Sequence, residues 1–89
     1  MYKITPYSYS QAKRLGVKIL PSKRKFKKID VYDRQGNYIT SVGDRRYFDY
    51  PTYIQRYGKK YADQRRKLYL IRHKNNTGTA GFYAENILW

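Results

Sequence analysis

The side chains that could act as acids, bases or nucleophiles are few and scattered along the chain. His73 is the only histidine, cysteine is absent, and there are six carboxylates. A general base needs a partner that orients it, but no serine stands near His73 in the sequence. Asp30 and Asp33 come close in sequence but fall on opposite faces of a strand. The sequence therefore predicts a protein that is not an enzyme, with a structural or surface role for His73.

The sequence also lacks the patterns that hold cofactors, metals or membranes. Without cysteine there is neither a disulfide framework nor a thiolate metal site. Gly78 and Gly81 belong to no phosphate-binding glycine loop. The longest apolar runs are far too short for a membrane span, and the start MYKITPYSYSQAKRLG lacks the apolar core of a secretory signal. We therefore expect a soluble, non-secreted protein with no cofactor and no small-molecule substrate.

Positive charge is the strongest feature of the composition. Twenty Lys and Arg side chains face six Asp and Glu, which gives a net charge of +14 and a sequence pI of about 10.1. Both halves of the chain carry the excess, so this is not a neutral domain with a basic tail. Such a field is normally matched by a polyanion or by an acidic protein surface.

The densest basic run lies within PSKRKFKKIDVYD, where residues 23–28 carry five positive charges and lead directly into a predicted strand. Three interpretations are open. The run could make about four or five phosphate contacts with a steep salt dependence, it has the composition of a nuclear-import signal, and it could be a charged strand edge that discourages aggregation. Because the rest of the chain does not neutralise the run, we favour partner binding by Lys23, Arg24, Lys25, Lys27 and Lys28.

Tyrosine and arginine interleave through DRRYFDYPTYIQRYGKKY and into RRKLYLIRH. Nucleic-acid grooves use these side chains for stacking and phosphate contact, and the centres of protein interfaces are also enriched in them. Some rings, such as Tyr57, Tyr61 and Tyr69, could instead form a core around Leu68 and Ile71. The candidate binding residues in this region are Arg45, Arg46, Tyr47, Arg65, Arg66, Tyr69, Arg72 and His73.

The N-terminal half is predicted to contain an arm and a sheet. Residues 1–13 are rich in Ser, Tyr and Pro without a clear period, which predicts an extended N-terminal arm. Residues 15–19 alternate like a short strand that Pro21 stops. In KKIDVYDRQGNYITSVGD, Asp33 and Gly36 suit a type I turn followed by a glycine bulge. This turn predicts a hairpin with three opposing pairs, Tyr32 with Tyr38, Val31 with Ile39, and Ile29 with Ser41.

After residue 50 the pattern is helical. Pro51 opens a short helix that Gly58 ends. Asp63 is the predicted N-cap of a second helix, QRRKLYLIRHK, which the pair Asn75 and Asn76, with Gly78, terminates. TAGFYAENILW forms a last short helix that packs on the hairpin or on the preceding helix.

A chain of 89 residues allows at most one domain with a small core. The predicted fold class is α+β. An arm covers residues 1–13, and a single small basic domain covers residues 14–89. That domain has an N-terminal β-hairpin or three-stranded antiparallel sheet followed by two to three short helices.

Three stretches of the chain are distinctive: PSKRKFKKIDVYDRQGNYITSVGDRRYFDY, DQRRKLYLIRH and TAGFYAENILW. Together they resemble a family of small basic proteins of unknown function encoded by nucleocytoplasmic large DNA viruses, including algal and giant viruses. The likeness covers most of the chain from Pro21 onward. The family is marked by a basic segment before a Tyr-containing strand, a Gly-Asp-x-Arg-Tyr step, an Arg-Arg-x-x-Tyr-x-x-Arg-His-like helix and a Thr-Ala-Gly-Phe to Leu-Trp closure. These motifs match residues 23–32, 43–47, 65–73 and 79–89.

The resemblance implies a setting in a virion or in the nucleus or cytoplasm of an infected host cell. Small, positive, non-enzymatic proteins of large viruses are often minor capsid or cement proteins under the shell, or genome-associated proteins. By this analogy we expect a structural virion protein on the inner side of the capsid that binds acidic surfaces of capsid proteins or the boundary between shell and genome. The alternative is a sequence-independent DNA-binding or packaging protein.

Overall fold

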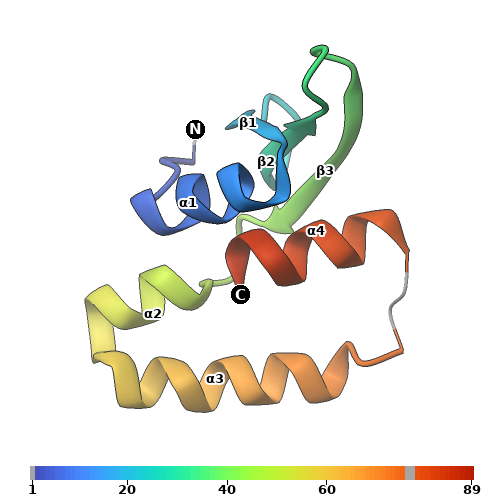
Figure 1. Ribbon diagram of the computed structural model, residues 1–89. Helices are drawn as coiled ribbons and strands as arrows, with labels where there is room; N and C mark the ends of the chain where they lie inside the picture. The colour runs from blue at the N-terminus through green and yellow to red at the C-terminus, as the bar shows by residue number, and fades with distance from the viewer. Residues whose placement is uncertain (1, 76–77) are drawn as a thin grey trace.

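A computed structural model describes residues 2–75 and 78–89 of the chain (Figure 1). The sheet is antiparallel with strand order β1-β2-β3, one helix precedes it and three follow. This arrangement confirms the predicted α+β class with a three-stranded sheet followed by helices. In chain order the elements are α1 (Pro6–Leu15), β1 (Lys18–Pro21), β2 (Lys27–Tyr32), β3 (Tyr38–Asp44), α2 (Tyr50–Tyr57), α3 (Lys59–Arg72) and α4 (Thr79–Leu88).

Helix α1 shows that the extended arm predicted for residues 1–13 is wrong over most of its length. Thr5 is the N-cap and its hydroxyl accepts a hydrogen bond from the backbone N–H of Ser8 at 3.3 Å, while a proline opens the first turn. The helix buries only small side chains, Ser8 and Ala12, and the Ser8 hydroxyl donates to the carbonyl of Ile87 at 2.9 Å. Because the buried face carries so little apolar surface, no helical hydrophobic period is visible in the sequence.

The hairpin between β2 and β3 forms at the predicted turn, but its register differs from the prediction. The Asp33 N–H donates to the carbonyl of Asn37 at 2.9 Å, and Tyr32 pairs with Tyr38 as expected. A bulge between Val31 and Tyr32 then shifts the ladder, because a bulge places an extra residue on one strand. Val31 therefore pairs with Thr40 rather than Ile39, and Ile29 pairs with Val42 rather than Ser41.

Strand β1 completes the sheet two to three residues later than predicted. It spans Lys18–Pro21 rather than residues 15–19, and Pro21 is its last residue, paired with Ile29. Proline is tolerated there because β1 is an edge strand. The central strand β2 is buried at four consecutive residues, which means that both of its faces are covered: Lys28, Ile29, Asp30 and Val31.

The core lies between the sheet and helices α1 and α4. Its fully buried members are Ile29, Val31, Val42, Ile87 and Leu88. Figure 1 shows the sheet at the top, α4 across the middle and the α2–α3 pair below it. No helix in residues 2–75 and 78–89 is long and apolar enough to cross a membrane.

Helix α2 begins at a side-chain cap, whereas α3 begins at Gly58 without one. The Asp49 carboxylate caps α2 by accepting from the N–H of Thr52 at 3.1 Å, and Gly58 ends α2 as predicted. The N-cap predicted at Asp63 is wrong, since α3 already begins at Lys59 and Asp63 lies inside it. Helix α3 ends at Arg72, before the stop predicted at Asn75 and Asn76. Asn76 lies outside the described residues.

Candidate functional site

A cleft of about 480 Å³ opens between the end of the sheet, the β3–α2 loop, α3 and α4. Segments far apart in the sequence meet there, including the first residues of β2, the second half of α3 and Trp89, which directly follows α4. Seven of the thirteen candidate binding residues line this cleft: Lys27, Lys28, Tyr47, Arg65, Tyr69, Arg72 and His73.

One wall of the cleft is a stack of aromatic rings. The ring of Tyr69 lies 4.4 Å from that of Trp89, with the planes 8° apart, and 4.3 Å from the ring of His73. Tyr53 tilts against Trp89 at 6.1 Å, and burial raises the pKa of the Tyr69 hydroxyl. The stack fixes α3 to the end of α4, and these rings already use one another as stacking partners.

The cations of the cleft come from two elements. Lys27 is exposed at the start of β2 and Arg72 is exposed at the end of α3. Arg65 lies two helical turns before Arg72 on the same side of α3, and its guanidinium sits 5.4 Å from the ring centre of Tyr53. A ligand in the cleft therefore meets positive charge from both the sheet side and the helix side.

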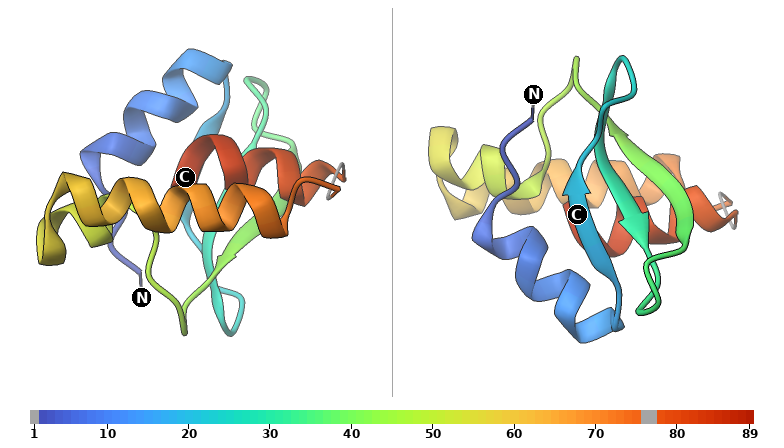
Figure 2. Two further views of the ribbon diagram at one scale, coloured as in Figure 1. Left: turned by 90° about the horizontal axis from the view of Figure 1, so that it is seen from below. Right: turned by 90° about the horizontal axis from the view of Figure 1, so that it is seen from above.

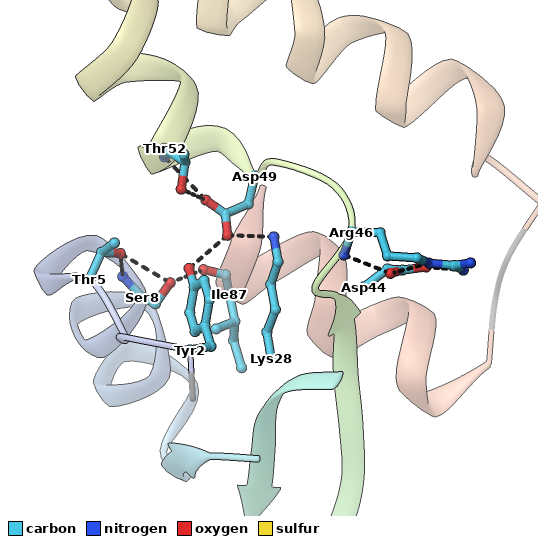
Figure 3. A network of polar contacts seen from close by, with 9 residues as sticks. All are labelled: Tyr2, Thr5, Ser8, Lys28, Asp44, Arg46, Asp49, Thr52 and Ile87. Carbon is cyan, nitrogen blue, oxygen red and sulfur yellow. Dashed lines mark hydrogen bonds and ion pairs between the residues drawn. The ribbon is translucent and has the colours of Figure 1, made fainter. Parts of the chain in front are cut away.

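Lys28 is not available to a partner, which corrects the prediction for this residue. It is 4% exposed, and its ammonium group lies 2.9 Å from a carboxylate oxygen of Asp49. The same oxygen accepts from the Tyr2 hydroxyl at 2.7 Å (Figure 3). The physical reason is that β2 is the central strand and is covered on both faces, so a lysine within it has to be paired.

The Asp49 carboxylate joins three segments of the chain, the N-terminal segment, β2 and the start of α2 (Figure 3). Burial alone would raise the pKa of this carboxyl, but the charge of Lys28 and the hydrogen bonds from Lys28, Thr52 and Tyr2 outweigh it and leave the pKa below its ordinary value. Burial, together with the hydrogen bond to Asp49, raises the pKa of the Tyr2 hydroxyl. The network is structural and holds α2 against the sheet.

A second cationic region, which we call the loop tip, consists of residues 22–26 of the β1–β2 loop and residues 45–48 of the β3–α2 loop. The two loops lie side by side at one end of the sheet (Figure 2, right), where the Arg45 N–H donates to the carbonyl of Phe26 at 2.8 Å. The charged residues of both loops are exposed. The loop tip brings together five further candidates, Lys23, Arg24, Lys25, Arg45 and Arg46.

Arg46 is the one loop-tip cation held in a fixed geometry by a carboxylate. Its Nε and Nη2 donate to the two oxygens of Asp44 at 3.0 and 2.7 Å. The hydrogen bonds and charge of Arg46 lower the pKa of Asp44 to about 2. Tyr47 follows directly and is 66% exposed, and it lines the cleft, so the loop tip and the cleft are continuous.

Arg66 lies apart from the other candidates. Its guanidinium sits 5.4 Å from the ring centre of Tyr50, in a second hollow on the opposite side of α3 that Asp63 and Lys59 also line. The interpretation of Leu68 and Ile71 as a small core is also wrong, since these side chains are 48% and 55% exposed.

The carboxylates leave most of the positive charge unmatched. Among the described residues three cations are in ion pairs, in the pairs of Lys28 with Asp49, Arg46 with Asp44, and Lys59 with Asp63. Asp33 is used inside the hairpin turn, where hydrogen bonds from the Asn37 and Gln35 backbones lower its pKa. These four carboxylates thus make contacts within the protein.

Sequence reasoning missed several aromatic members of the site. Phe48, Tyr53 and Trp89 line the cleft, and Phe26 lies in the loop tip. For Phe26 the signal was present as an apolar ring inside the run KRKFKK. In residues 2–75 and 78–89 no three His, Asp or Glu side chains gather to hold a metal ion.

Comparison of the chain with models of protein families, with curated proteins and with solved structures finds no match.

Proposed function

We propose that this protein is a non-enzymatic module that binds the phosphate backbone of nucleic acid, independent of base sequence, along the cleft and the loop tip. The observation that carries the proposal is the convergence of Lys27, Arg65 and Arg72 on one cleft that is continuous with the exposed cations of the loop tip. A backbone of regularly spaced phosphates is the common polyanion that such an arrangement fits.

The chemistry of the proposed contact is charge neutralisation. Each Lys or Arg that meets a phosphate releases a condensed counterion, and this release drives binding that weakens as salt is added. The ring of Tyr53 contacts the guanidinium of Arg65 and restricts this side chain before binding. The conformational entropy that Arg65 loses on binding is therefore smaller. The stacked rings of Tyr69, His73 and Trp89 supply a rigid wall behind the cations.

The experiment is fluorescence anisotropy with a labelled DNA duplex at about 50 and about 200 mM salt, the range over which counterion release is diagnostic. The double variant Arg65→Gln/Arg72→Gln should reduce the slope of log affinity against log salt by about two. The matched control is Arg14→Gln/Arg34→Gln, which removes two exposed arginines on α1 and in the hairpin turn. Equal losses from both variants would show a diffuse field without a site. Weak binding at low salt of both this duplex and a single strand of the same length by the native protein would refute the proposal.

A second candidate function is a minor capsid or cement protein of a large DNA virus, on the inner side of the capsid. The observation in its favour is that exposed cations also occur away from the cleft, on α1 and β1, where Lys13, Arg14 and Lys18 lie. A protein with basic surfaces on several sides suits a position between an acidic capsid subunit and the genome. After nuclease treatment of opened particles, a capsid protein stays with the shell fragments, whereas a genome-bound protein is released.

A further inference from the structure

The loop tip presents a strained and exposed phenylalanine. Phe26 has φ +69°, in the left-handed region that an L-residue with a bulky side chain rarely adopts. Its side chain is 51% exposed, so burial does not offset the strain. A glycine or asparagine would adopt this backbone more easily. An unfavourable conformation that exposes an apolar ring indicates that the ring serves a function outside the fold.

A second exposed ring, that of Tyr47, lies near the same arginine as the Phe26 ring. The guanidinium of Arg46 lies 5.5 Å from the ring centre of Phe26 and 5.8 Å from that of Tyr47. Asp44 holds this guanidinium with two hydrogen bonds, as Figure 3 shows. The two rings therefore lie around one hydrogen-bonded arginine, with the exposed cations of residues 23–25 in the same loop tip.

We propose that Phe26 and Tyr47 form a base-stacking site for unpaired nucleotides, so that the protein prefers single-stranded nucleic acid. The inference rests on the proposed backbone binding and adds the class of strand that is bound. Aromatic rings flanked by cations bind single strands by stacking on bases of any sequence. In a duplex the bases are stacked on one another, so an exposed ring gains little. The cleft rings of Tyr69, His73 and Trp89 cannot take this role, because they stack among themselves.

The test compares a labelled oligothymidine strand with a labelled duplex of equal length, by anisotropy at one salt concentration. Phe26→Asn removes the ring and relieves the backbone, so we expect a melting temperature equal to or above that of the native protein. Its affinity for the single strand should fall about five-fold or more, with little change on the duplex. Phe26→Tyr, which keeps a ring, should retain single-strand binding.

The matched control is Phe82→Asn, because Phe82 on α4 is exposed to a similar extent, 48%, and lines neither the cleft nor the loop tip. It should leave both affinities unchanged. Tyr47→Ser provides a second ring deletion that does not involve the strained backbone, and it should show the same selective loss. Unchanged single-strand affinity in Phe26→Asn and Tyr47→Ser overturns the stacking site, even where the duplex still binds with a steep salt dependence. Failure of the native protein to bind either probe overturns the backbone proposal itself.

Discussion

At the scale of residues, the pair of Lys28 and Asp49 is the most consequential polar contact. Asp49→Asn keeps a good N-cap for α2 but leaves the ammonium group of Lys28 buried without a counter-charge. We expect the variant to lose about 3 kcal/mol or more of unfolding free energy at neutral pH, measured by urea unfolding. The double variant Lys28→Met/Asp49→Asn should recover much of the loss, since no buried charge remains. Full stability of Asp49→Asn would contradict this account.

The same pair predicts the pH dependence of stability. The folded state depresses the pKa of Asp49, so the unfolded chain binds the proton more readily. The contribution to stability is complete above the ordinary carboxyl pKa of 3.8 and is lost as the pH falls from there through the lower folded value. Urea unfolding of the native protein should show this acid loss, and Lys28→Met/Asp49→Asn should show less of it.

Charge and residue type were enough to predict which side chains are candidates, but not which of them are free. Lys27 and Lys28 are adjacent in the same basic run, yet one is exposed and the other is buried. The difference depends on Asp49, which is 21 residues away in sequence, and on the coverage of both faces of β2. The convergence of Arg65 and Tyr47 on one cleft likewise depends on how the α2–α3 pair folds back toward the sheet, which no local pattern encodes.

At the scale of elements, the contact of β3 with α4 depends on one glycine. Gly43 has φ +83°, and a Cβ there would lie 2.7 Å from Cδ1 of Leu88 and 2.9 Å from Cδ of Lys28. Gly43→Ala therefore combines backbone strain with overpacking, and we expect it to cost about 2 kcal/mol or more. The control is Gly36→Ala, where φ is +87° but nothing lies within 4 Å. Equal melting temperatures for the two variants would show that Gly43 of β3 is not closely packed against Leu88 of α4.

Elements with local signals were predictable and those defined by packing were not. The hairpin turn at Asp33 and the helix end at Gly58 follow from turn and cap chemistry, and both are confirmed. Helix α1 was missed because its buried face consists of Ser8 and Ala12, which give no apolar period. The start of α3 was misplaced because Asp63, a good capping residue, instead lies inside the helix and accepts hydrogen bonds from Tyr50 of α2 and from Lys59 of its own helix.

At the scale of the whole molecule, charge should make folding and ligand binding respond to salt in opposite directions. The net charge of +14 repels itself in the compact state, and raising salt from about 50 to about 500 mM shortens the screening length from roughly 14 Å to roughly 4 Å. We therefore expect the melting temperature to rise by about 4 °C or more over this range, equivalent to about 1 kcal/mol. DNA affinity should fall over the same range. A melting temperature that falls with salt would mean that the ion pairs outweigh the repulsion, and the unmatched charge would then need no polyanion to stabilise it.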